Sequence, residues 1–108
     1  MSNAAPERPR DAAGWTFLSN HAHVLICLAG GPDLLQREIA ARVGITERAV
    51  QLILADLEKE GLVSRERVGR RNHYVLHLDQ PLRHPIEAHR SVRELIEWVM
   101  GSGTVREA

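Results

Sequence analysis

Apolar residues recur at helical spacing in four stretches of the chain. These stretches are residues 19–29, 36–43, 47–60 and 85–100. Intervals of three and four residues place apolar side chains on one face of a helix, opposite a polar face. The pattern therefore predicts four amphipathic helices that pack around one small core.

After Gly61 the apolar period shortens from about 3.6 residues to about two, as in a strand with two different faces. The alternating positions are Tyr74, Leu76 and Leu78 on one face, and His73, Val75 and His77 on the other. Gly69 marks a turn within residues 64–78, which predicts an antiparallel hairpin. Leu34 is a candidate for a one-residue third strand beside this hairpin.

The junction between the second and third helices has the features of a tight helix-to-helix turn. Gly44 stands where a helix commonly ends in the left-handed conformation, which glycine adopts at the lowest cost. Thr46 can cap the next helix by accepting a backbone N–H hydrogen bond, and Glu47 suits the positive end of the helix dipole. Two helices joined in this way form a helix-turn-helix.

The helix over residues 47–60 has a core face and a second face. The core face holds Ala49, Val50, Ile53, Leu54 and Leu57, and the second face holds Arg48, Gln51, Leu52, Ala55 and Lys59. If this helix reads DNA, the second face lies in the major groove with its N-terminal residues nearest the base edges. Leu52 and Ala55 make part of that face apolar.

Positive charge is concentrated in the hairpin. The whole chain has 14 basic and 14 acidic residues, whereas residues 64–77 hold four arginines against Glu66, a net charge of three. Arg70, Arg71 and Asn72 crowd the turn. A basic tip of this kind can lie against phosphates or enter a minor groove.

Residues 34–78 resemble the winged helix-turn-helix domain of bacterial transcription regulators of the MarR and ArsR types. The matching segments are REIAARVGIT, ERAVQLILADLEKEGLV and SRERVGRRNHYVLHL, for the helix-turn, the recognition helix and the wing. With its flanking helices the resemblance extends over roughly residues 15–100. It implies a mainly α fold of about four helices with a small antiparallel β-wing of two strands, or three as the alternative.

The resemblance also implies binding to double-stranded DNA. In the recognition helix the expected contacts are Thr46, Glu47, Arg48 and Gln51. In the wing they are Arg65, Arg67, Arg70, Arg71, Asn72 and His73. A module for protein–protein interaction or dimerisation, without specific DNA binding, is the alternative, and the apolar Leu52 and Ala55 favour it.

The helix expected over residues 85–100 begins at Pro85, where a missing N–H is harmless. It can pack on its own domain or form the seam of a homodimer, as terminal helices do in the families that the chain resembles. Its apolar side holds Ala88, Val92, Leu95, Ile96 and Val99. A dimer would set two recognition helices about 34 Å apart, one DNA turn, to read a palindromic site.

The length of 108 residues fits a single domain, expected over residues 15–100. Residues 1–14 are predicted to be a disordered tail and residues 101–108 a flexible one. Trp15, Phe17 and Leu18 are predicted to cover the core as a lid.

Several classes of function are not supported by the sequence. The chain has no catalytic motif, which indicates that it is not an enzyme, and no metal or cofactor is expected from its six histidines and single Cys27. No apolar run reaches the roughly 20 residues of a membrane span, and there is no signal-peptide pattern, so a cytoplasmic location is expected. A small-molecule effector is unknown, because no residues define a pocket for one.

Overall fold

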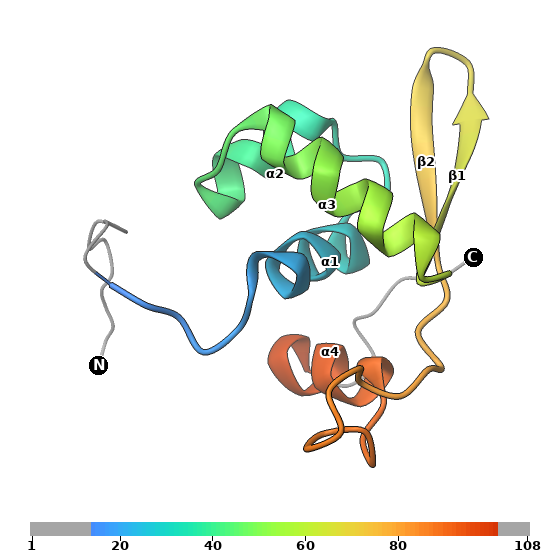
Figure 1. Ribbon diagram of the computed structural model, residues 1–108. Coiled ribbons are helices and arrows are strands. Elements are labelled where there is room, and N and C mark those ends of the chain that lie inside the picture. The colour runs from blue at the N-terminus through green and yellow to red at the C-terminus, as the bar shows by residue number, and fades with distance from the viewer. Residues whose placement is uncertain (1–13, 102–108) are drawn as a thin grey trace.

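The computed structural model describes residues 14–101 (Figure 1). Apart from Gly14 and Gly101, the two predicted tails lie outside the described residues. Four helices and a two-stranded antiparallel sheet make up the fold, as the sequence predicts. The elements are α1 (Asn20–Gly30), α2 (Gln36–Val43), α3 (Glu47–Lys59), β1 (Val63–Val68), β2 (Arg71–Leu76) and α4 (Val92–Met100).

Helix α1 is the centre of the helical body. It packs against α2 and α3, and α4 packs against it from below in Figure 1. The hairpin of β1 and β2 projects away from the helices at the C-terminal end of α3. The largest fully buried side chains come from all of these layers: Val24, Leu28, Ile39, Val50, Leu54, Tyr74, Leu78 and Ile96. One hydrophobic core therefore fixes the recognition helix, the hairpin base and α4 together.

The helix-turn-helix has the boundaries that the sequence predicts. Gly44 ends α2 with φ at 86°, a left-handed conformation that favours glycine. The Thr46 hydroxyl accepts a hydrogen bond from the backbone N–H of Ala49 at 3.0 Å and so caps α3. Leu35 cannot cap α2 with its side chain, but its N–H donates to the Glu38 carboxylate at 2.7 Å.

Strands β1 and β2 pair in register from Val63 opposite Leu76 to Val68 opposite Arg71, so the turn is the pair of residues Gly69 and Arg70. The sheet has two strands in the described part of the chain, and the third strand considered at Leu34 does not form. Instead, the carbonyl of Pro32 accepts one hydrogen bond from the N–H of Tyr74 at 3.1 Å. This contact ties the connection between α1 and α2 to the hairpin.

The predicted start of the last helix was wrong. Helix α4 begins at Val92, and the segment from His84 to Arg90 forms successive turns. Pro85 therefore starts a turn and not a helix, and Ala88 lies outside α4.

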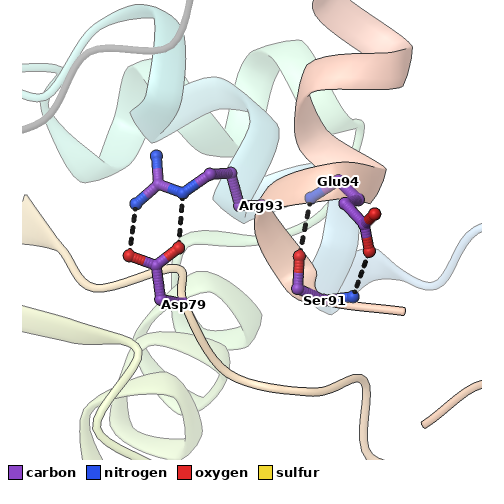
Figure 2. A network of polar contacts seen from close by, with 4 residues as sticks. All are labelled: Asp79, Ser91, Arg93 and Glu94. Atoms are coloured by element: carbon purple, nitrogen blue, oxygen red, sulfur yellow. Dashed lines mark hydrogen bonds and ion pairs between the residues drawn. The ribbon is translucent and has the colours of Figure 1, made fainter. Parts of the chain in front are cut away.

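The cause of this late start is visible at Ser91 (Figure 2). Its hydroxyl accepts from the N–H of Glu94 at 3.1 Å, while the Glu94 carboxylate accepts from the N–H of Ser91 at 2.8 Å. This reciprocal capping box stabilises a helix end at Ser91. A bridge between Pro81 and Ser91 also holds Ser91 in an extended conformation, which stops the helix from starting earlier.

The apolar side of α4 is divided between the core and the surface. Val92 and Ile96 are buried in the protein's own core, against α1. Their burial within one copy leaves them almost no surface for contact with a second copy, which does not support their predicted place in a dimer seam. Leu95 is half-buried, and Val99 and Trp98 are exposed.

The predicted lid is also wrong for two of its three residues. Trp15 and Phe17 are exposed and touch each other edge to face, with ring centroids 4.9 Å apart. Leu18 is half-buried. Between Gly14 and Gly101 no helix has both the length and the apolar character needed to cross a membrane.

Candidate nucleic-acid interface

The face of α3 that points away from the core is exposed along the whole helix. We call this face the α3 stripe, and its members are Arg48, Gln51, Leu52, Ala55 and Lys59. Thr46 and Glu47 are exposed at its N-terminal end. Val50, Ile53, Leu54 and Leu57 are buried on the opposite side. The two faces predicted from the sequence are therefore confirmed, except that Ala49, predicted for the core face, is only half-buried.

Acidic side chains near the C-terminal end of α3 are held by basic partners on other elements. The pairs are Asp56 with His21, Glu58 with Arg65, and Glu60 with Arg83, at N–O distances of 2.8, 3.0 and 3.5 Å. Each pair draws a carboxylate toward α1, β1 or the segment before α4. The α3 stripe itself contains two basic residues, one amide and two apolar residues, and no acid.

Arg65 joins the hairpin to α3. Its Nε and Nη2 atoms donate to the two carboxylate oxygens of Glu58 at 3.0 and 3.1 Å, and its guanidinium lies 6.0 Å from the ring centroid of Tyr74. The hydrogen bonds that Arg65 donates to Glu58 raise the pKa of Arg65 above its already high ordinary value. A bidentate ion pair of this kind fixes the relative orientation of the two side chains and also adds a charge interaction. The base of the hairpin is thus held against the recognition helix.

The tip of the hairpin is exposed and basic. Arg67, Arg70 and Arg71 are all exposed there, and the Arg67 Nε donates to the carbonyl of Gly69 at 3.4 Å. The strand register places Arg67 on the same face as Arg65, and Arg71 with Val68 on the other. Cations therefore point from both faces of the hairpin and from its turn.

Two further wing residues predicted to bind DNA are partly buried. The Nδ1 of His73 lies 2.7 Å from a carboxylate oxygen of Asp33, which ties β2 to the connection between α1 and α2. Asn72 pairs across the strands with Arg67 and is half-buried. Nearer the base, the hydroxyl of Ser64 lies 3.0 Å from Nε2 of His77. The contacts of His73 and His77 stiffen the hairpin between its tip and its base.

The exposed helix, the glycine-centred turn and the basic hairpin together make the surface of a winged helix-turn-helix. The sequence model described as the MarR family matches residues 16–71, more than half of the chain. The chain belongs to the MarR family. Members of the MarR family are transcription regulators and not enzymes. The matched range holds α1, α2, α3, β1 and the first residue of β2.

Three solved structures share this fold. The first, a predicted DNA-binding transcriptional regulator from E. coli, has a TM-score of 0.52 and 22% identity over 73% of this chain and 72% of that one. MepR, a regulator of the Staphylococcus aureus multidrug efflux pump MepA, has a TM-score of 0.52 and 22% identity over 74% of this chain and 55% of its own.

The third is PcaV from Streptomyces coelicolor, solved with its natural ligand. It has a TM-score of 0.50 and 25% identity over 77% of this chain and 60% of its own. The chain therefore spans little more than half of MepR and PcaV. No curated protein sequence matches it.

A cleft of about 500 Å³ is present in this MarR-family domain. It runs between α1, the C-terminal half of α3, and α4 with the segment before it. Its walls are mainly apolar, with charged groups including the paired Asp56, Glu60 and Arg83 among its lining residues.

Cys27 is a free, partly buried cysteine in this MarR-family fold. Burial raises the pKa of the Cys27 thiol, an effect that the charge of Arg42 partly opposes, so the thiolate is disfavoured at neutral pH. Within residues 14–101 no group of three or more His, Cys, Asp or Glu side chains is arranged to hold a metal ion.

Proposed function

We propose that the chain regulates transcription by binding double-stranded DNA as a homodimer on a palindromic site in the cytoplasm. Helix α3 enters the major groove, and the hairpin of β1 and β2 lies on the backbone or in the adjacent minor groove. One observation carries the proposal: the exposed α3 stripe holds two basic residues and no acid, and Asp56, Glu58 and Glu60 beside its C-terminal half are paired with basic side chains on other elements. A surface that approaches phosphates loses affinity for each uncompensated negative charge that it presents.

The residues at the start of α3 are assigned to the base edges. The Arg48 guanidinium suits guanine O6 and N7, and the Gln51 amide suits adenine N6 and N7. Glu47 can accept from the amino group of cytosine, and Thr46 can contact either a base or a phosphate. All four are exposed, as this role requires.

The wing residues divide into two groups. Arg67, Arg70 and Arg71 are assigned to phosphates because they are exposed at the tip of the hairpin. Arg65 and His73 are assigned to positioning, because Glu58 and Asp33 bind their nitrogen atoms within the protein. Asn72 is assigned to neither role alone: it is half-buried, and it pairs across the strands with the exposed Arg67.

The surface of α4 supports the dimer. At about 100° per residue, the apolar positions of this helix cover about 200° of its circumference, which is wider than one packed face needs. Val92 and Ile96 use one part of that arc inside the core. Leu95, Trp98 and Val99 form the other part, and Trp98 is 82% exposed. Regulators of the MarR family bind DNA and typically act as dimers.

Sedimentation velocity over a range of protein concentrations tests the dimer. We expect the wild type to dimerise and the Trp98→Gln variant to remain a folded monomer, because Trp98 contributes nothing to the protein's own core. Val68→Gln is the matched control, since Val68 is also apolar and exposed but lies at the hairpin tip. A monomeric wild type, or a Trp98→Gln variant that still dimerises, would rule out this surface as the seam.

Selection from a pool of random DNA duplexes, at two salt concentrations, tests the function as a whole. Enrichment of a palindrome would establish both the reader and its dimer, and the spacing of the half-sites would give the distance between the two α3 helices. The test variant is Arg48→Ala, which is expected to change the enriched sequence. Its charge-matched control is Arg90→Ala, which is expected to leave the enriched sequence unchanged. Arg90 lies before α4, where it pairs with Glu94 at 3.0 Å.

The alternative function is a winged-helix module for protein interaction. The exposure of Leu52 in the middle of the α3 stripe is the observation that favours it, because an apolar side chain there also suits a protein partner. Failure to retain any duplex at low salt would decide for this alternative. Retention without enrichment of a sequence would instead indicate nonspecific contact through the wing.

A further inference from the structure

Leu52 is the one large apolar side chain that is exposed on α3 within the described residues. The residue is 53% exposed and lies outside the core cluster. It follows Arg48 by one helical turn and precedes Ala55 by three residues, so it occupies the middle of the α3 stripe. A single exposed leucine is common on protein surfaces. This one is distinguished by its position between basic residues at both ends of the same stripe.

We propose that Leu52, assisted by Ala55, determines sequence specificity by contacting the C5 methyl group of thymine in the major groove. This inference rests on the proposed DNA-binding function and names part of the site that α3 reads. A leucine side chain has no hydrogen-bond donor or acceptor, so it cannot read the polar edges of the bases. The thymine methyl is the apolar group that the unmodified major groove offers to such a side chain.

The surroundings of Leu52 favour DNA as the occupant of this position. Arg48 precedes it and Lys59 lies near the end of the stripe, so basic side chains lie on both sides of the apolar pair Leu52 and Ala55. Asp56, the acidic residue closest to Leu52 along α3, is drawn toward α1 by His21 at 2.8 Å. The small side chain of Ala55 leaves room beside Leu52 for the approach of a methyl group.

The geometry of α3 also predicts where this thymine lies. Leu52 is about 6 Å further along the helix axis than Arg48, at about 1.5 Å per residue. Base pairs are spaced by about 3.4 Å, so the two side chains reach positions about two base pairs apart. A guanine read by Arg48 should therefore be followed, about two pairs away, by a thymine on one of the strands.

The test removes the methyl group from the enriched duplex, one thymine at a time, by substituting deoxyuridine. Base pairing is retained, so only the methyl contact changes. We expect the wild type to lose affinity about fourfold when the contacted thymine is substituted in one half-site, because the contact buries one methyl-sized group. Substitution of that thymine in both half-sites should lower the affinity about fifteenfold. Fluorescence anisotropy titrations of the wild type and variants measure these ratios.

The variants separate a methyl contact from a general loss of binding. Leu52→Ala should bind the thymine duplex with the reduced affinity of the substituted site and show no further loss with deoxyuridine. Leu52→Met, which keeps an apolar side chain of similar reach, should retain the discrimination. Ile86→Ala is the matched control, because Ile86 is exposed and apolar but lies in the segment before α4. It should discriminate as the wild type does.

Two results would overturn the inference while leaving DNA binding intact. In one, the wild type binds an enriched sequence but is insensitive to deoxyuridine at every thymine. In the other, Leu52→Ala keeps the full sensitivity of the wild type, which would assign the methyl contact to another residue. If no sequence is enriched from the random pool at all, the proposed function fails together with this inference.

Discussion

Removing the two arginines at the turn of the hairpin should weaken the salt dependence of DNA binding by a calculable amount. Each phosphate contact contributes about 0.9 to the slope of log K against log salt concentration, through release of counterions. Arg70→Ala with Arg71→Ala removes two contacts from one wing, a change of about 1.8. In a dimer with both wings on DNA, the slope should change by about 3.6.

This change of slope has a direct consequence for affinity. Between 50 and 200 mM salt, the ratio of wild-type to variant affinity should shrink by about 150-fold, because a slope difference of about 3.6 acts over a fourfold change in salt. Anisotropy titrations on one enriched duplex at four salt concentrations measure both slopes. The loss should be similar on unrelated duplexes, since phosphates carry no sequence information.

Arg65→Ala is the control within the same hairpin. Because both carboxylate oxygens of Glu58 bind its guanidinium, this substitution should leave the salt slope close to that of the wild type. It should instead lower the free energy of unfolding by up to about 1 kcal/mol, the range of half-exposed ion pairs. An unchanged slope in the Arg70 and Arg71 double variant would refute the role of the tip. A loss of slope in Arg65→Ala would refute its assignment to positioning.

Three further predictions concern stability, measured by urea denaturation and circular dichroism. Ile96→Ala should lower the free energy of unfolding by about 2–5 kcal/mol, because Ile96 is fully buried between α4 and α1. Tyr74→Phe should be neutral or stabilising by about 1 kcal/mol, since the buried hydroxyl has no hydrogen-bond partner among the described residues. Asp79→Asn should flatten the acid side of the pH–stability curve. Hydrogen bonds from Arg93 lower the pKa of Asp79 in the folded protein below its ordinary value of 3.8. The stability that the ionised Asp79 contributes is therefore lost as the pH falls from 3.8 through the lowered pKa of the folded state.

The helix-turn-helix could be predicted closely because its signals are local. The bounds of α2 follow from apolar spacing and from Gly44, and the start of α3 follows from the cap at Thr46. Each of these signals acts between residues at most four positions apart, so the sequence displays it directly. The exposed and buried faces of α3 were predictable for the same reason.

The start of α4 was missed although a local signal was present. Ser91 and Glu94 have the spacing of a capping box, but Pro85 gives a competing signal, because proline also favours the first position of a helix. The choice between these two signals depends on the backbone bridge from Pro81 to Ser91. That bridge closes the loop formed by residues 82–90, whose path the apolar pattern does not show.

The partners of the wing residues could not be read from the sequence. Arg65 meets Glu58 seven positions away, and His73 meets Asp33 forty positions away. Such contacts depend on how the hairpin is placed against α3 and against the connection before α2. Composition alone made every wing arginine an equal candidate for phosphate binding, whereas the fold separates the positioned Arg65 from the exposed tip.

Helix α1 connects the two surfaces that a dimeric regulator must coordinate. It packs against α3, to which His21 also ties it through Asp56, and on another side it packs against α4. The buried Ile96 and Val92 therefore set the angle at which α4 presents Trp98, relative to a core that also fixes the α3 stripe. If two copies join through Trp98, the distance between their α3 helices is determined by packing on α1. Side chains that touch no DNA would then select the spacing of the half-sites.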